Sequence, residues 1–225
     1  MTLGADDQEE LFRDFARDVS GGESALMVQV NTLIVNPPTT LEDIGYYGLE
    51  NAPQPERTLR GIISALTEAG HLLCAEDKYI YEFPLVLMEE GLADAGDNPE
   101  GLDLRRIVEA VDWDAGEQPD WPAFKQTFAD HTRQVEQAVA RTGNRLLSVQ
   151  LPLGDTLHFW VAPEDMAKRW QGTTLYSGPS TVKFSHSPKV TIKITSPDWI
   201  NYWSFLTYAF RIPKEHNALP EGLDH

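Results

Sequence analysis

The sequence predicts an α+β fold with a mainly antiparallel sheet and several amphipathic helices. Segments with apolar residues at helical spacing and short β-branched runs both occur, but they do not follow the regular strand–helix alternation of a parallel sheet. A four-residue turn, Pro-Leu-Gly-Asp at 152–155, separates two such runs as in a hairpin. With 225 residues, of which 41% are hydrophobic, the chain can bury a core without disulfide support.

The N-terminal segment begins with a predicted helix over 5–20. Its apolar residues fall on one stripe, acidic residues occupy its first turn, and Gly21 and Gly22 end it. Residues 25–35 are rich in valine, leucine and isoleucine, and they predict one strand or a bent pair of strands. The sequence Asn-Pro-Pro at 36–38 breaks this strand, and a threonine after it can cap a short helix.

A second clear helix is predicted over 56–69. Two prolines precede it, its apolar residues recur on one face, and Gly70 is its stop signal. Residues 72–83 then predict a strand.

The middle of the chain is predicted to be helical at 84–92, 99–111 and 120–141. The last of these is the longest helix and carries a stripe of aromatic and valine residues. The stretches 93–101 and 112–122 flank the helix at 99–111. They are polar and rich in glycine, proline and acid, so they form the candidate hinge region.

Short strands dominate the rest of the sequence. The turn at 152–155 joins predicted strands over 145–151 and 156–162, and a proline then opens a helix over 163–170. The remaining predicted elements are strands over 173–177, 181–185 and 190–195, a helix that begins at 196–198, and a loose tail over 213–225. We therefore expect one domain over 1–212.

The chain also contains two segments with weakly similar sequences. Residues 12–18 resemble residues 124–130, and each segment lies in a predicted helix that ends at glycine and precedes a predicted strand. One interpretation is two related helix-plus-hairpin halves that meet at a sub-boundary near 112–120. The other, which we favour, is that two amphipathic helices look alike.

Acidic residues dominate the first half of the chain. The whole sequence has 35 acidic and 18 basic residues, a net charge of −17. Residues 1–120 alone carry −19, and residues 76–120 carry −11 from 14 acidic and three basic side chains. A general nucleic-acid binder needs a basic surface, so this class is excluded. The asymmetry indicates either a surface that maintains solubility or a face for a basic protein partner.

The partner hypothesis assigns one tryptophan and a set of acidic residues to the binding face. Tryptophan ringed by polar groups is typical of interface hot spots. A basic partner is expected to contact Glu89, Glu90, Asp94, Asp97, Asp112, Trp113, Asp114, Glu117 and Asp120.

The sequence lacks the familiar motifs of cofactor and metal sites. No run matches the Rossmann or Walker glycine pattern. Cys74 is the single cysteine, and no two of the six histidines lie within one helical turn. We therefore expect no metal and no cofactor.

One group of residues supports an enzyme as the alternative function. Asp155 lies in the hairpin turn, His158 on the strand that follows and His186 in a later turn. Together they could supply the carboxylate and imidazole that general acid–base catalysis uses, for example in a small-molecule hydrolase. Strand alternation explains His158 equally well as an outward residue between Leu157 and Phe159.

The function that we expect is a non-enzymatic, cytoplasmic binding protein. The first charges of the chain are acidic, where an export signal has basic ones, and no apolar run approaches the ~18 residues of a membrane span. A lone cysteine is typical of a reducing compartment. The most concrete version is an immunity or inhibitor protein that masks a basic toxin or nuclease. The enzyme is the alternative, and a structural or adaptor subunit is the third hypothesis.

Overall fold

A computed structural model describes residues 4–39, 51–76, 82–103, 120–151, 156–179, 189–197 and Trp199. Its helices and its five-stranded sheet confirm the predicted α+β class. The chain divides into two compact units. Unit 1 comprises Met1–Cys74 and Leu147–Ser196, and unit 2 comprises Ala75–Leu146 and Pro197–His225. The predicted tail at 213–225 and the sub-boundary near 112–120, apart from Asp120, lie outside the described residues.

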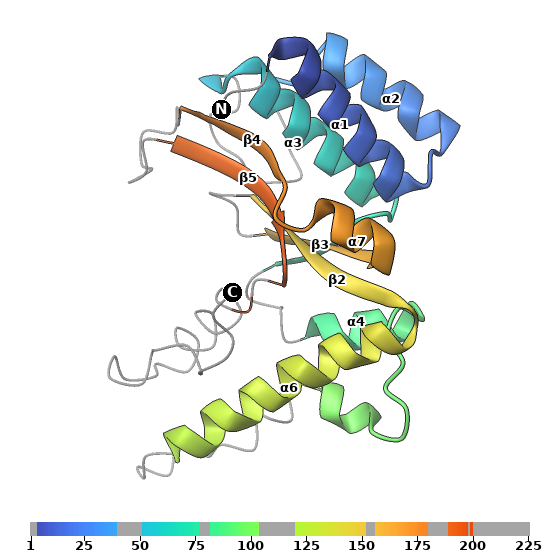
Figure 1. Cartoon of the computed structure of the whole chain (residues 1–225), viewed down its shortest axis with the longest axis vertical. Coiled ribbons are helices and arrows are strands. Elements are labelled where there is room, and N and C mark those ends of the chain that lie inside the picture. The colour runs from blue at the N-terminus through green and yellow to red at the C-terminus, as the bar shows by residue number, and fades with distance from the viewer. Residues whose placement is uncertain are drawn as a thin grey trace. The chain divides into compact units, whose positions relative to one another are not determined.

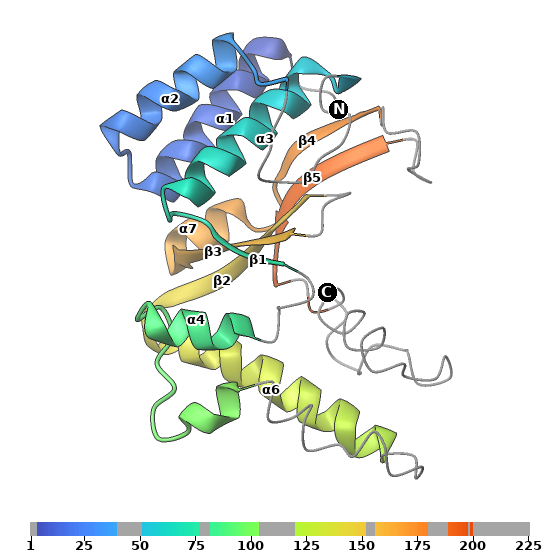
Figure 2. The same cartoon turned by 180° about the vertical axis from the view of Figure 1, so that it is seen from behind.

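Three helices pack on one another in unit 1: α1 (Ala5–Ser20), α2 (Ser24–Val35) and α3 (Gln54–Glu68). The predicted helices at 5–20 and 56–69 are thereby confirmed. α1 ends as predicted, because Gly21 adopts the left-handed conformation (φ 63°) that glycine tolerates best. α1 and α3 also contact strand β4, and α2 lies along the outer side of these two helices (Figures 1 and 2).

The predicted strand at 25–35 is wrong, because these residues form α2. Leu26, Val30 and Ile34 recur every fourth residue and are buried, so packing against two neighbouring helices outweighs the β propensity of valine and isoleucine. The interpretation of residues 12–18 and 124–130 as parts of two related halves also loses support. α1 is followed by a helix, whereas the helix that holds residues 124–130 is followed by a strand.

The sheet has the strand order β1-β3-β2-β5-β4. The strands are β1 (Leu73–Glu76), β2 (Asn144–Gln150), β3 (Thr156–Pro163), β4 (Thr174–Pro179) and β5 (Lys189–Thr195). β2 and β3 are neighbours, as the hairpin prediction requires. β5 pairs antiparallel with both β2 and β4, with Val149 opposite Ile194 and Tyr176 opposite Ile192. Of the predicted strand at 72–83, β1 confirms residues 73–76, whereas Phe83 already belongs to a helix; residues 77–81 lie outside the described part.

Strand β5 shows the alternation of buried and exposed residues that is expected of a sheet with one solvent-exposed face. Val190, Ile192 and Ile194 are buried, whereas Lys189 and Lys193 are exposed. The predicted strand at 181–185 and the helix after 198, apart from Trp199, lie outside the described residues.

The core of unit 1 forms between the helices and the sheet. Phe15 of α1 meets the rings of Trp160 and Trp170 edge to face, with centroids 6.3 and 5.6 Å away. The side-chain amide of Gln8 donates to the backbone oxygen of Leu175 on β4 at 2.6 Å, which ties α1 to this strand.

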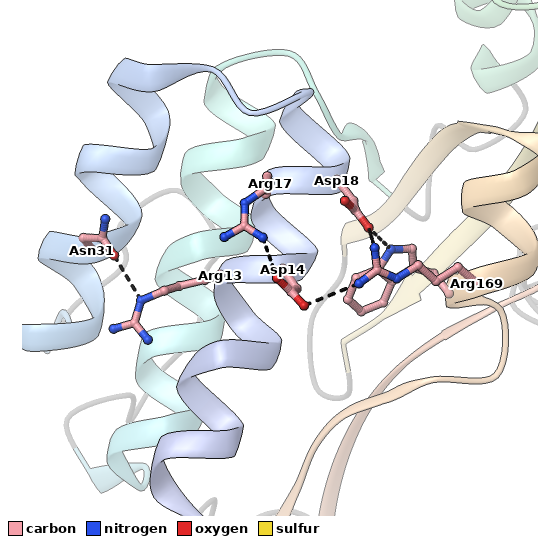
Figure 3. Close-up of polar contacts among 7 residues, drawn as sticks. Arg13, Asp14, Arg17, Asp18, Asn31 and Arg169 are labelled. Atoms are coloured by element: carbon pink, nitrogen blue, oxygen red, sulfur yellow. Dashed lines mark hydrogen bonds and ion pairs between the residues drawn. The ribbon is translucent and has the colours of Figure 1, made fainter.

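Charged side chains hold the short helix α7 (Glu164–Trp170) against α1 (Figure 3). Arg169 donates to Asp18 at 2.7 Å and to Asp14 at 3.4 Å. The indole nitrogen of Trp170 also donates to Asp18, at 2.8 Å. On α1 itself, Arg17 pairs with Asp14 at 2.6 Å.

Unit 2 contains α4 (Phe83–Glu89), the 3-10 helix η4 (Pro99–Leu102) and α6 (Trp121–Arg141). The helices predicted at 84–92 and 120–141 are confirmed. Of the helix predicted at 99–111 only the single turn η4 is seen, since Asp103 is extended and later residues lie outside the described part. The indole of Trp199 donates to Glu136 of α6 at 2.8 Å. No helix in the described ranges is both long and apolar enough to cross a membrane.

Candidate functional site

The candidate site is the acidic segment, by which we mean residues 82–103 of unit 2. It contains seven acidic and no basic side chains. Glu89 and Glu90 are exposed at the C-terminal end of α4, and Asp94 and Asp97 are exposed in the loop between α4 and η4. Four of the residues predicted to bind a partner are therefore exposed within nine consecutive residues of the chain.

Backbone hydrogen bonds fix the loop on the C-terminal end of α6. The amide of Asp94 donates to the carbonyl of Ala138 at 2.9 Å, and Arg141 donates its Nε hydrogen to the carbonyl of Asp94 at 2.6 Å. The hydroxyl of Thr142 donates to the carbonyl of Leu92 at 3.4 Å. Because the loop is held through its backbone, the carboxylates of Glu89, Glu90 and Asp97 are not used to hold it.

The segment then follows α6 towards the middle of that helix. Asn98 caps η4 by accepting a hydrogen bond from the amide of Gly101 at 3.1 Å. The carbonyl of Gly101 in turn accepts from Nδ1 of His131, on α6, at 3.3 Å. A Cβ at position 101 would meet the ends of the Gln134 and Asn98 side chains, so a larger residue there requires these side chains to move.

His131 is itself buried below the acidic segment. Burial lowers the pKa of its imidazole from 6.5 to about 4, although the hydrogen bond to Gly101 and the charge of Asp103 act in the opposite direction. The ring is therefore neutral at pH 7, and His131 adds no positive charge beneath the acidic segment.

Four of the acids that were predicted to bind a partner form no ion pair with another described residue. Among the described residues, no basic side chain pairs with Glu89, Glu90, Asp94 or Asp97, and Asp94 only accepts a hydrogen bond from the nearby amide of Gly96 at 2.9 Å. Arg141, the basic side chain bonded to this loop, is bound to a backbone oxygen rather than to a carboxylate. In the part of the chain that the structure describes, these four carboxylates therefore form no ion pair with arginine or lysine, although Arg141 lies beside the loop.

Asp120 has a different role from the other predicted acids. Its side chain accepts a hydrogen bond from the amide of Ala123 at 3.2 Å and so caps the N-terminus of α6. Asp94 is bonded near the other end of this 21-residue helix, about 30 Å away at 1.5 Å per residue. The predicted set is therefore not one compact cluster. Asp112, Trp113, Asp114 and Glu117 lie outside the described residues.

The enzyme hypothesis depended on Asp155, His158 and His186. The structure describes only His158, and it is buried at 2% exposure rather than pointing outward as alternation allowed. The reason is that both faces of β3 are covered, since Phe159 is buried as well. Burial, together with the positive charge of Arg60, lowers the pKa of His158 to about 4.

The hydrogen bonds around His158 fix its tautomer. Thr67 donates its hydroxyl hydrogen to the carbonyl of Ile63 at 2.8 Å, so its oxygen can only accept from Nδ1 of His158, 3.3 Å away. Nε2 is therefore the bare nitrogen, and it has no hydrogen-bond partner among the described residues. A ring this deeply buried is not presented to a substrate at the surface.

Sequence reasoning missed a buried ion pair beside this histidine. On α3, Arg60 donates to Glu56 at 3.0 Å, and both side chains are almost completely buried. The available signal was the position of the two charges. Residues 56, 60, 63 and 67 recur on one face of the helix, in line with its apolar stripe.

No group of three or more histidine, cysteine, aspartate or glutamate side chains that could hold a metal ion occurs within the described ranges. The chain matches no protein-family model, no curated protein and no solved structure. The candidate function therefore depends on the geometry and charge of the chain itself.

Proposed function

We propose that the chain is a cytoplasmic protein-binding module whose acidic segment masks a basic protein, most concretely as an immunity or inhibitor protein for a basic toxin or nuclease. The observation that carries the proposal is the absence of ion pairs at Glu89, Glu90, Asp94 and Asp97 among the described residues. Carboxylates that are already exposed and uncompensated lose no internal partner when they meet arginine or lysine on another protein.

The attachment of the acidic segment to α6 supports the same function. The amide of Asp94 donates to the carbonyl of Ala138, and its carbonyl accepts from Arg141, so the loop is ordered before any partner arrives. Binding to an ordered loop loses less conformational entropy than binding to a flexible one. A fixed array of like charges also accelerates the encounter with a partner of opposite charge.

The enzyme alternative receives less support. His158, the one member of the hypothetical site within the described residues, is enclosed in the core of unit 1. A general base has to come within hydrogen-bond reach of its substrate, and this position does not offer that.

The test is native purification at low salt, followed by mass spectrometry of the chains that co-purify. We expect a basic protein that dissociates as salt rises, because the Debye length falls from ~10 Å at 0.1 M to ~3 Å at 1 M. The double variant Glu89→Lys/Glu90→Lys should retain much less of it. The matched control is Glu10→Lys/Glu68→Lys, which makes the same charge change at exposed positions of unit 1. Equal retention by the two variants would contradict the assignment of the site.

Trp113 offers a second arm of this test. If it is a desolvated anchor of the interface, Trp113→Ala should raise the dissociation rate of the captured partner, whereas reversal of the acids should lower the association rate. Surface plasmon resonance with the captured protein separates the two rates. An unchanged dissociation rate would remove Trp113 from the proposed interface.

A further inference from the structure

Helix α2 carries a second apolar face that the fold of unit 1 does not use. Val28 and Val35 are 67% and 82% exposed, and with Val86 of unit 2 they are the exposed large hydrophobic residues of the described part. Ala25 and Thr32 are exposed on the same side of the helix. We call these four residues, Ala25, Val28, Thr32 and Val35, the outer stripe.

The spacing of the outer stripe is that of a helix-packing seam. Its members follow one another at intervals of three, four and three residues, which is the repeat that packs one helix along another. Thr32 uses its hydroxyl hydrogen within the helix, donating to the carbonyl of Val28 at 3.0 Å. The buried residues Leu26, Val30 and Ile34 occupy the opposite side, so the stripe faces away from the core of unit 1.

The charge around the stripe indicates what covers it. α2 has no charged residue, unlike every other helix in the described part of the chain. Arg13 of α1 donates to Asn31 of α2 at 3.1 Å (Figure 3). It also pairs with Glu9 at 3.1 Å, so its charge is compensated. A basic partner gains nothing from such a face. Two copies of a chain with net charge −17 repel least where neither copy presents a charge.

We propose that the outer stripe packs against the same stripe of a second copy, in an antiparallel pair about a two-fold axis. Such an axis makes the interface self-complementary. In the antiparallel arrangement Val28 meets the partner's Thr32, and the helix dipoles oppose each other. A contact limited to a 12-residue helix is smaller than the ~1,200 Å² of stable interfaces, so the dimer is weak and forms at high protein concentration.

The test is sedimentation velocity on the full chain over a range of protein concentrations, at low and at high salt. We expect the average mass to rise towards that of a dimer with concentration. It should rise further at high salt, because salt screens the repulsion between two acidic copies. Partner capture by the acidic segment has the opposite salt dependence, so the two proposals can fail separately.

Two substitutions sharpen this experiment. Val28→Glu/Val35→Glu should keep the chain monomeric throughout, and Val28→Gln/Val35→Gln should raise the dimer dissociation constant about tenfold or more. Glutamine favours helix more than valine does, so the second variant should fold at least as well. The matched control Val86→Glu alters the exposed valine of α4 and should leave self-association unchanged. A wild-type chain that is monomeric in every condition, or association that survives Val28→Glu/Val35→Glu, would overturn the proposal.

Discussion

Helix α1 and the acidic segment are both rich in carboxylates, but the two regions use them differently. On α1, Glu9, Asp14 and Asp18 each pair with an arginine, and two of these pairs join the helix to Arg169 of α7 (Figure 3). In the acidic segment, Glu89, Glu90, Asp94 and Asp97 have no such partner among the described residues. The composition of the sequence does not distinguish these two groups of carboxylates. In the structure, those of α1 form ion pairs within unit 1, whereas the four of the acidic segment are exposed without an ion pair to another described residue.

This comparison predicts a graded response to mutation, in which paired charges matter for stability and unpaired charges do not. The cost should depend on how deeply each pair is buried, because desolvation of a charge that loses its partner grows with burial.

The largest effect is expected at the buried pair of α3. Arg60→Leu removes the guanidinium that Glu56 contacts inside the core, and breaking a buried pair in this way costs about 3–5 kcal/mol. Urea unfolding followed by far-UV circular dichroism measures the loss. The double variant Glu56→Gln/Arg60→Leu removes both charges and should recover part of it. A loss below about 1 kcal/mol in Arg60→Leu would show that the pair does not support the fold.

The next effect is a loss of stability between pH 7 and pH 5. His158 and His131 have folded-state pKa values of about 4, below the 6.5 of the unfolded chain. The unfolded state therefore binds protons first as pH falls through 6.5, and stability is lost progressively down to pH 4. Each histidine should remove about 2 kcal/mol by pH 5. The free energy of unfolding, measured at several pH values, should fall less steeply between pH 7 and pH 5 in His158→Gln and in His131→Gln than in the wild type. An identical slope would contradict the neutral, buried state of these rings.

A smaller effect is expected where α1 holds α7. Asp18→Ala removes the acceptor of the Trp170 indole and of Arg169, and it should cost about 1–2 kcal/mol. Most of this loss comes from the buried indole, since Arg169 is half exposed and its ion pair is screened by water. Asp18→Asn keeps an acceptor oxygen and should lose less, as thermal unfolding can check. Equal losses would mean that charge, not the indole hydrogen bond, holds α7.

The smallest effect is expected in the acidic segment. Glu89→Lys/Glu90→Lys should change the free energy of unfolding by no more than about 0.5 kcal/mol, because neither carboxylate has an ion pair within the described residues. Lysine at the C-terminal end of α4 is also favourable to the helix dipole. A loss comparable with that of Asp18→Ala would show that these acids are part of the fold, and the comparison between the two regions would fail.

Local patterns predicted most of the fold. α1, α3 and α6 have a clear apolar stripe, and β5 has strict alternation, so each was recognised from its own residues. α2 was missed because both of its sides are apolar and no helical period stands out. The outward placement of His158 failed because β3 is covered on both faces, which depends on other parts of the chain.

The candidate site was predicted from composition, but its state of pairing was not. Arg169 meets Asp18 across 151 residues of sequence, and no local rule anticipates such a pair. Glu56 and Arg60 are four residues apart, a spacing that usually marks a solvent-exposed helix face. Their burial follows from the packing of α3 against neighbouring elements, which the spacing alone does not contain.

Unit 1 is assembled from two stretches of chain, Met1–Cys74 and Leu147–Ser196, and this affects how it is made. During synthesis α1–α3 leave the ribosome first, while Trp160 and Trp170, which pack on Phe15, follow on the order of ten seconds later. Until then the apolar face of α1 has no sheet to cover it. The residues made in this interval include 76–120, which carry a net charge of −11. Like charge on neighbouring nascent chains opposes their aggregation, so these acidic residues also make the unfinished polypeptide less prone to aggregate.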